Sequence, residues 1–128
     1  MEFHHAGIAT RETEPLVELY RELFQTEVVH REELGDLEAT FLPLGESYLE
    51  LLEPLNGGTI GRYLDRQGPG VHHLAMRTPD IEAALDRAQS MGIELVDETP
   101  RPGAWGHDVA FLHPSDTGGV LIEFVASH

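Results

Sequence analysis

The chain carries, close to its start, the stretch His4-His5-Ala6-Gly7-Ile8-Ala9, and it carries the same kind of stretch again at His72-His73-Leu74-Ala75-Met76-Arg77. Each half also has one Glu inside a late apolar run. These runs are Tyr48-Leu49-Glu50-Leu51-Leu52 and Leu121-Ile122-Glu123-Phe124-Val125. Self-similarity of this kind indicates that a chain is built from repeated structural units. We therefore predict a duplication, with a His on an early strand and a Glu on a late strand of each half.

Composition limits the classes of function that need to be considered. The 128 residues are 41% hydrophobic, which is enough to form a buried core. The formal net charge of −15 argues against nucleic-acid or anionic-membrane partners, because both require positive surface. The absence of Cys excludes disulfides and thiolate chemistry. With no long apolar stretch and no signal-peptide pattern, we expect a cytoplasmic protein.

Both halves show the same order of predicted elements, strand–helix–strand–strand–strand. In the first half, strands are expected over residues 3–9, 27–33, 37–43 and 46–53, with a helix capped by Thr13 and a further short helix over 59–66. In the second half, strands are expected over 71–77, 93–96, 108–113 and 120–125, with a helix over 79–91 that Gly92 ends. This order predicts one domain, residues 1–128, made of half-modules at about 1–67 and 68–128.

Four residues at repeated positions are candidate metal ligands. Successive residues of a strand point to opposite faces of the sheet. His5 is therefore expected on the face opposite to His4, and His73 on the face opposite to His72. Carboxylates within apolar strands, such as Glu50 and Glu123, are costly to bury unless a cation or strong donors meet them. Two His and two carboxylates suit a divalent metal such as Co²⁺, Mn²⁺, Ni²⁺, Zn²⁺ or Fe²⁺.

The competing interpretation of each residue alone is structural. A Glu in a strand usually faces solvent, and a single His is usually no ligand, so only the repetition in both halves favours a metal site. His4 and His72 are expected to be structural or solvent-facing. The terminal His128 is expected at the surface.

The same residues resemble the vicinal-oxygen-chelate superfamily and, within it, the methylmalonyl-CoA epimerase family. The resemblance rests on His5-Ala6-Gly7-Ile8-Ala9, Glu50-Leu51-Leu52-Glu53-Pro54-Leu55, Gly70-Val71-His72-His73-Leu74-Ala75 and His113-Pro114 followed by Thr117-Gly118-Gly119-Val120-Leu121-Ile122-Glu123. It implies an α+β fold in which two tandem βαβββ modules form a cupped, partly closed mixed sheet. It also implies a homodimer and a divalent metal, Co²⁺ before the others, held by His5, Glu50, His73 and Glu123.

The resemblance further implies an activity and two catalytic bases. The family epimerises (2R)- and (2S)-methylmalonyl-CoA by removing a proton from one face of the α-carbon and returning one on the other. Glu123 corresponds to one base. The second is a Glu upstream of a Gly, for which Glu33, before Leu34 and Gly35, is the nearest match. The Gly lies one residue further from Phe41 than the family spacing, so Glu32 is the alternative.

Several alternatives and substrate contacts stay open from the sequence. A glyoxalase I activity on glutathione hemithioacetals and a non-catalytic binding protein of the same superfamily are the competing functions. Arg101 resembles part of a family loop near the acyl-CoA substrate, whereas Ser115 stands where the family often has Lys. Trp105 is expected to pack in the core rather than on the substrate.

Overall fold

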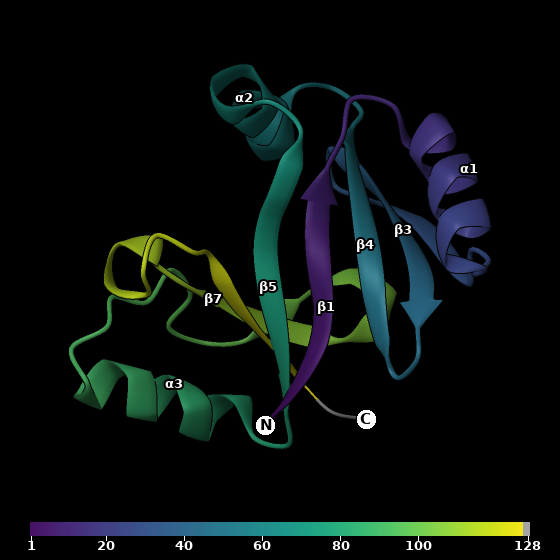
Figure 1. Ribbon diagram of the computed structural model, residues 1–128. Coiled ribbons are helices and arrows are strands. Elements are labelled where there is room, and N and C mark those ends of the chain that lie inside the picture. The colour runs from purple at the N-terminus through teal and green to yellow at the C-terminus, as the bar shows by residue number, and fades with distance from the viewer. Residues whose placement is uncertain (127–128) are drawn as a thin grey trace. The chain divides into compact units, whose positions relative to one another are not determined.

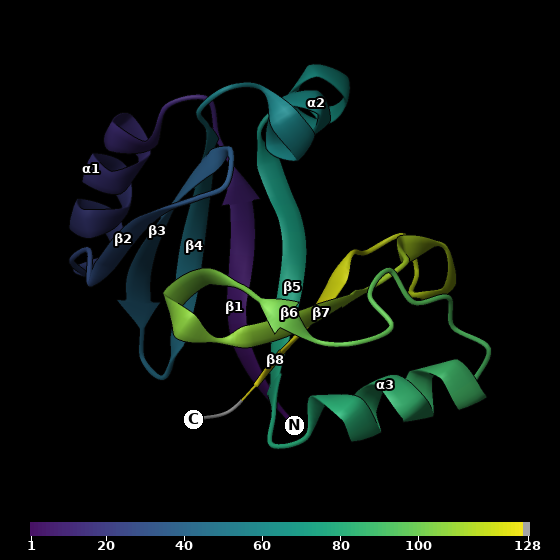
Figure 2. The ribbon, with the colours of Figure 1, turned by 180° about the vertical axis from the view of Figure 1, so that it is seen from behind.

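The structure is a computed structural model that describes residues 1–126, and this part of the chain forms two compact units (Figures 1 and 2). The first unit is His5–His72. The second combines Met1–His4 with the residues from His73 onward. The chain thus passes into the second unit within the second copy of the His-His motif. His128, which was expected at the surface, lies outside the described residues.

The first unit is a four-stranded sheet with a helix on one face. Its elements are β1 (Glu2–Ala9, shared with the second unit), α1 (Thr13–Phe24), β2 (His30–Leu34), β3 (Leu37–Leu44), β4 (Ser47–Pro54) and α2 (Gly58–Gln67). The strand order is β2-β3-β4-β1, antiparallel except for the parallel pair β1–β4. Val17 of α1 packs on Leu42 and Leu51, so the helix covers the face that these two residues share. The residues of β3 and β4 that alternate with Leu42 and Leu51 lie on the opposite face, which carries the candidate site.

The second unit repeats this plan with a shorter edge. Its elements are β5 (Gly70–Thr78), α3 (Ile81–Ser90), β6 (Arg101–Pro102), β7 (Asp108–Leu112), β8 (Ile122–Ala126) and two 3-10 turns, Ala104–Gly106 and Pro114–Asp116. The strand order is β5-β8-β7-β6, with β5 and β8 parallel and the other pairs antiparallel. Leu85 of α3 packs in a buried cluster with Leu112 and Phe124. Two βαβββ modules are therefore confirmed, each with a helix against its sheet.

All three predicted helices form, and the C-terminal stop of the helix predicted over 79–91 is confirmed. Asp80 caps α3, because its side chain accepts a hydrogen bond from the Ala83 N–H at 3.0 Å. Gly92 follows the helix with a φ of 83°, a conformation that suits glycine. Within residues 1–126, no helix combines the length and apolar character that a membrane crossing requires.

The strand expected over 93–96 is wrong. Only Leu95 forms a β-bridge, to Leu112, and β6 provides the edge strand instead. The reason is local, since the N–H groups of Val96 and Asp97 both donate to the Phe111 carbonyl, so the pairing cannot continue as a regular ladder. The Asp97 carboxylate then accepts the Phe111 N–H at 2.9 Å. The apolar residues of this segment do alternate, but they pack against the core cluster that contains α3 and do not form a strand.

The cap predicted for α1 is also wrong. Thr13 is the first helical residue rather than the cap, and Glu12 at the cap position makes no side-chain capping bond. The Thr13 N–H instead donates to Glu53 Oε1 of β4 at 2.6 Å. Glu53 is distant in sequence, so a tertiary contact supplies the acceptor and places negative charge at the helix N-terminus.

We expect Glu53→Ala to lower the free energy of unfolding by about 1 kcal/mol, the typical contribution of a helix cap. The cost arises because the Thr13 N–H loses its acceptor in a buried position. Urea unfolding followed by circular dichroism measures it. Glu53→Gln keeps an acceptor oxygen and is expected to lose less. Equal stability of the Ala variant and the wild type would contradict this role of Glu53.

Candidate active site

The first candidate site pair lies in the first unit. His5 Nε2 of β1 is 3.1 Å from Glu50 Oε1 of β4, and both side chains are at least nine-tenths buried. The parallel register places Gly7, not His5, directly beside Glu50. Because Gly7 has no side chain, the carboxylate of Glu50 can lean along the sheet toward the imidazole of His5.

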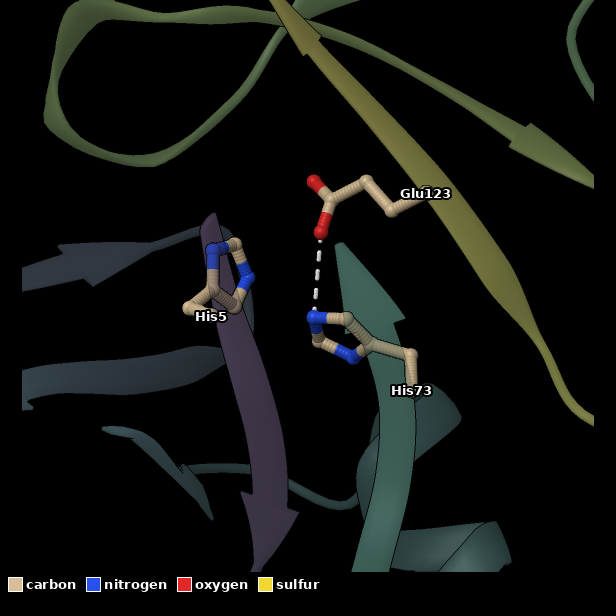
Figure 3. A group of neighbouring side chains, drawn as sticks. All are labelled: His5, His73 and Glu123. Carbon is tan, nitrogen blue, oxygen red and sulfur yellow. Dashed lines mark ion pairs between the residues drawn. The ribbon is translucent and has the colours of Figure 1, made fainter. Parts of the chain in front are cut away.

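The second pair repeats this geometry in the second unit. His73 Nε2 of β5 is 3.0 Å from Glu123 Oε1 of β8, as the dashed line in Figure 3 shows, and both side chains are again buried. The residue directly beside Glu123 is Ala75, two positions after His73, just as Gly7 is two positions after His5. The duplication read from the sequence therefore holds at the level of atoms, including the small residue that makes room for each Glu.

The donor atoms of these pairs fit a divalent metal. His5, His73 and Glu123 are buried residues of the types that ligate metals, and Glu50 adds a second buried carboxylate. Burying a carboxylate is costly unless a cation or strong hydrogen-bond donors compensate it. Imidazole nitrogen and carboxylate oxygen together suit Co²⁺, Mn²⁺, Ni²⁺, Zn²⁺ and Fe²⁺, and they do not select one of these ions.

Each pair is bordered by a phenylalanine that sequence reasoning missed. The Phe41 ring meets His5 edge-on at a centroid distance of 5.8 Å, and the Phe111 ring meets His73 in the same way at 5.7 Å. Both stand directly beside the Glu of the next strand, Phe41 beside Glu50 and Phe111 beside Glu123. An available signal was the Phe-Leu pair in the strand before each Glu strand. An aromatic wall beside each imidazole restricts its orientation and excludes water from it.

The two candidates for the second base lie on opposite faces of β2. Glu33 is exposed and pairs in register with Glu38. Glu32 is partly buried and its Oε1 lies 3.0 Å from His30 Nε2. Because His30 stands beside Phe41 and Phe41 beside Glu50, the face of Glu32 is the face that carries Glu50. The catalytic role of Glu33 remains a prediction, and its side chain leaves the sheet on the other face.

The neighbouring histidines have contacts of their own. His4 is buried and meets the His107 ring edge-on at 5.3 Å, within the second unit. His72 is partly buried and meets the Tyr63 ring edge-on at 4.8 Å, within the first unit. Each ring thus has an aromatic contact, and the expectation for both was a structural or solvent-facing position.

The loop residues singled out from the sequence are placed as follows. The guanidinium of Arg101 lies 5.3 Å over the Phe111 ring and donates to Asp97 Oδ1 at 3.0 Å. Trp105 is partly buried within a 3-10 turn and has a φ of 61°, which is uncommon for a residue other than glycine. Ser115 is exposed and its hydroxyl lies 2.9 Å from His113 Nδ1. The structure thus places Arg101 in strand β6, on the sheet face that carries Phe111 and the candidate ligand Glu123.

Comparison with known proteins decides the family. Residues 4–111 match the model of the glyoxalase/bleomycin resistance protein/dioxygenase superfamily. The chain belongs to this superfamily. An ethylmalonyl-CoA/methylmalonyl-CoA epimerase of Cereibacter sphaeroides is 34% identical over 125 residues, which cover 94% of this chain and 93% of the relative.

Solved structures give the same result for the whole length of the chain. Methylmalonyl-CoA epimerase from Mycobacterium tuberculosis is 33% identical with a TM-score of 0.93, covering 99% of this chain and 88% of that one. A variant of Streptomyces coelicolor methylmalonyl-CoA epimerase, in complex with 2-nitronate-propionyl-CoA, is 35% identical with a TM-score of 0.94, covering 99% and 94%. The resemblance to methylmalonyl-CoA epimerases and the α+β fold that it implies are both confirmed.

Proposed function

We propose that this chain is a metal-dependent methylmalonyl-CoA epimerase that interconverts the (2R) and (2S) thioesters. The observation that carries the proposal is the duplicated buried His–Glu pair, His5 with Glu50 and His73 with Glu123. Full-length similarity to epimerases, one of them solved with an acyl-CoA analogue, supports the choice of substrate. The substrate of the proposed reaction is therefore an acyl-CoA.

The metal would be held by His5, Glu50, His73 and Glu123. When bound there, a divalent ion would stabilise the negative charge that develops on the thioester oxygen as the α-proton leaves. The ion would also attract the two oxygens of the substrate's 1,3-dicarbonyl unit and so help to orient the α-carbon. Co²⁺ is the first candidate, with Mn²⁺, Ni²⁺, Zn²⁺ and Fe²⁺ as the others.

Glu123 would serve as one of the two proton-transferring groups. Its carboxylate is buried beside His73, where little water competes for it. A carboxylate held in such surroundings can take the α-proton from one epimer and return a proton when the other epimer is formed. Epimerisation needs a second group for the opposite face of the α-carbon, the role that the family resemblance gives to Glu33 or Glu32.

We propose a homodimer, as the family resemblance implies, and a cytoplasmic location. The substrate is an anion and the chain carries only eight Lys and Arg, so local cationic groups such as Arg101 would have to meet the coenzyme A phosphates or the substrate carboxylate.

Enantiopure (2S)-methylmalonyl-CoA gives the test that separates this function from the alternatives. The Co²⁺-loaded protein should convert it to an equal mixture with the (2R) form, measured on the intact thioester by separating the two coenzyme A diastereomers. The glutathione hemithioacetal of methylglyoxal should stay unchanged in a parallel assay. Turnover of the hemithioacetal alone would indicate a glyoxalase I activity, and turnover of neither would favour a binding protein.

A further inference from the structure

The turn of the β2–β3 hairpin rests on the first residue of α2, and both elements belong to the first unit. A Cβ added to Gly58 would lie 1.8 Å from Asp36 Oδ2 and 2.3 Å from Asp36 Cγ. The Asp36 carboxylate therefore fills the space that a side chain at position 58 would take. The backbone is joined here as well, because the Leu55 N–H donates to the Asp36 carbonyl at 2.8 Å. We call these two interactions of Asp36, with Gly58 and with Leu55, the turn contact.

The turn contact holds a strand that has few other attachments. β2 is the edge strand of the first unit and pairs only with β3 among the described strands. An edge strand opens more readily than an interior one, because half of its backbone groups have no partner strand. The turn contact acts at the end of β2 that carries Glu32 and Glu33, and it opposes opening at that end.

The helix gives the turn contact a fixed support. Ile60 and Leu64 of α2 are buried, so the helix is held by its own packing. Its first turn has no acidic residue, and its N-terminus has no side-chain cap. The Asp36 carboxylate thus places negative charge beside this N-terminus from another part of the chain. The helix dipole favours a negative charge at that position.

Two neighbouring glycines separate backbone strain from contact with Asp36. Gly57 and Gly58 have φ values of 78° and 72°, so a side chain at either position is strained. An added Cβ at Gly57 would meet no atom within 4 Å, whereas one at Gly58 would collide with Asp36. The same substitution at the two positions therefore has the same backbone cost, and only the one at Gly58 displaces the carboxylate.

We propose that Asp36 and Gly58 are positioning residues of the epimerase, whose contact keeps the β2–β3 hairpin in a fixed place within the first unit. The inference rests on the proposed function, in which a carboxylate of this hairpin, Glu32 or Glu33, transfers a proton. It holds for either carboxylate, because both lie within four residues of Asp36 in the chain. A displacement of about 1 Å can lower the rate of a reaction about 10²-fold. Loss of the turn contact should therefore slow the reaction without weakening substrate or metal binding.

Two substitutions test the proposal, since Asp36→Ala removes the carboxylate and Gly58→Ala displaces it. In each Co²⁺-loaded variant, we expect kcat for interconversion of the epimers to fall by about 10–100-fold, with KM and Co²⁺ affinity unchanged. The amides of β2 that pair with β3 should also exchange their hydrogens faster, which NMR measures without substrate. The double variant should be no slower than Asp36→Ala, because both changes break one contact.

Gly57→Ala is the matched control, because it adds the same Cβ at a similar φ away from Asp36. It should lose stability but keep the kcat and the β2 amide exchange of the wild type. All rates are compared at a temperature at which circular dichroism shows every variant to be folded. Asp36→Asn keeps the shape of the side chain, so it should recover most of the kcat that Asp36→Ala loses.

Three outcomes would overturn the assignment. Wild-type kcat in Asp36→Ala would show that the turn contact positions no reacting group, even if β2 exchanges faster. Equal losses of kcat in Gly57→Ala and Gly58→Ala would attribute the effect to backbone strain. Unchanged exchange of the β2 amides in Asp36→Ala would show that the contact does not hold the hairpin. If the wild type itself converts neither epimer, the epimerase function fails, and amide exchange still decides whether Asp36 holds the hairpin.

Discussion

Replacing Glu123 with Gln is expected to lower kcat for epimerisation by about 10³-fold, within the range that a general acid–base group contributes. Gln has the size of Glu and keeps an oxygen that can face His73, 3.0 Å away in the wild type. What it loses is the ability to take up a proton at that oxygen. The loss should therefore appear in kcat, measured from interconversion of the separate epimers, and less in the amount of metal bound.

The matched control for this variant is Glu82→Gln, which removes the same charge from an exposed position on α3. Its kcat should equal that of the wild type. If Glu123→Gln keeps more than about a tenth of the wild-type kcat, a loss far below the usual contribution of a general base, Glu123 is not one of the two proton-transferring groups.

Replacing His73 with Ala is expected to weaken binding of Co²⁺ by at least about 100-fold, because even outer partners of metal ligands contribute 10–100-fold to affinity. The repeated geometry predicts a loss of the same order for His5→Ala, since each His faces a buried Glu in the same way. Equilibrium dialysis with metal analysis measures the affinity without relying on activity. Activity should fall with the metal content.

His72→Ala is the control for this pair of variants. His72 is the immediate neighbour of His73, but its ring contacts Tyr63. The His72→Ala variant should therefore bind Co²⁺ with the affinity of the wild type. Unchanged metal affinity in both His5→Ala and His73→Ala would mean that the buried His–Glu pairs are structural ion pairs and not ligands.

Repetition is what made the candidate ligands predictable. A single His or Glu in a strand carries little information, because most such residues are structural or solvent-facing. The same two residue types at matching positions of both halves identified His5, Glu50, His73 and Glu123. The structure then adds a feature that follows from register alone, the small residue, Gly7 or Ala75, beside each Glu.

Features that depend on tertiary contacts were not predictable in this way. The cap of α1 comes from Glu53, which no local pattern could pair with Thr13. The segment around Leu95 alternates like a strand, yet Asp97 binds the neighbouring strand through its side chain and ends the ladder. In both places a side chain takes over a contact that a local rule assigns to the backbone or to a nearer residue.

The choice between Glu32 and Glu33 depends on the strand register, because a shift of one residue would exchange the faces of these two side chains. A strand expected over 27–33 leaves open which of Glu32 and Glu33 faces the site. The observed pairing of Leu34 with Leu37 across the Gly35-Asp36 turn decides it, because it places alternate residues on opposite faces. With that register, His30 and Glu32 share the face of Glu50.

The most direct test of metal-dependent epimerisation is the C2 proton signal of methylmalonyl-CoA, followed by NMR in deuterated buffer with and without a chelator. We predict that the protein causes the signal to disappear as deuterium replaces the proton. Chelation should stop this exchange, and added Co²⁺ should restore it. Exchange that persists after the metal is removed would contradict the metal dependence, and a signal that stays constant with every divalent ion would contradict the epimerase function itself.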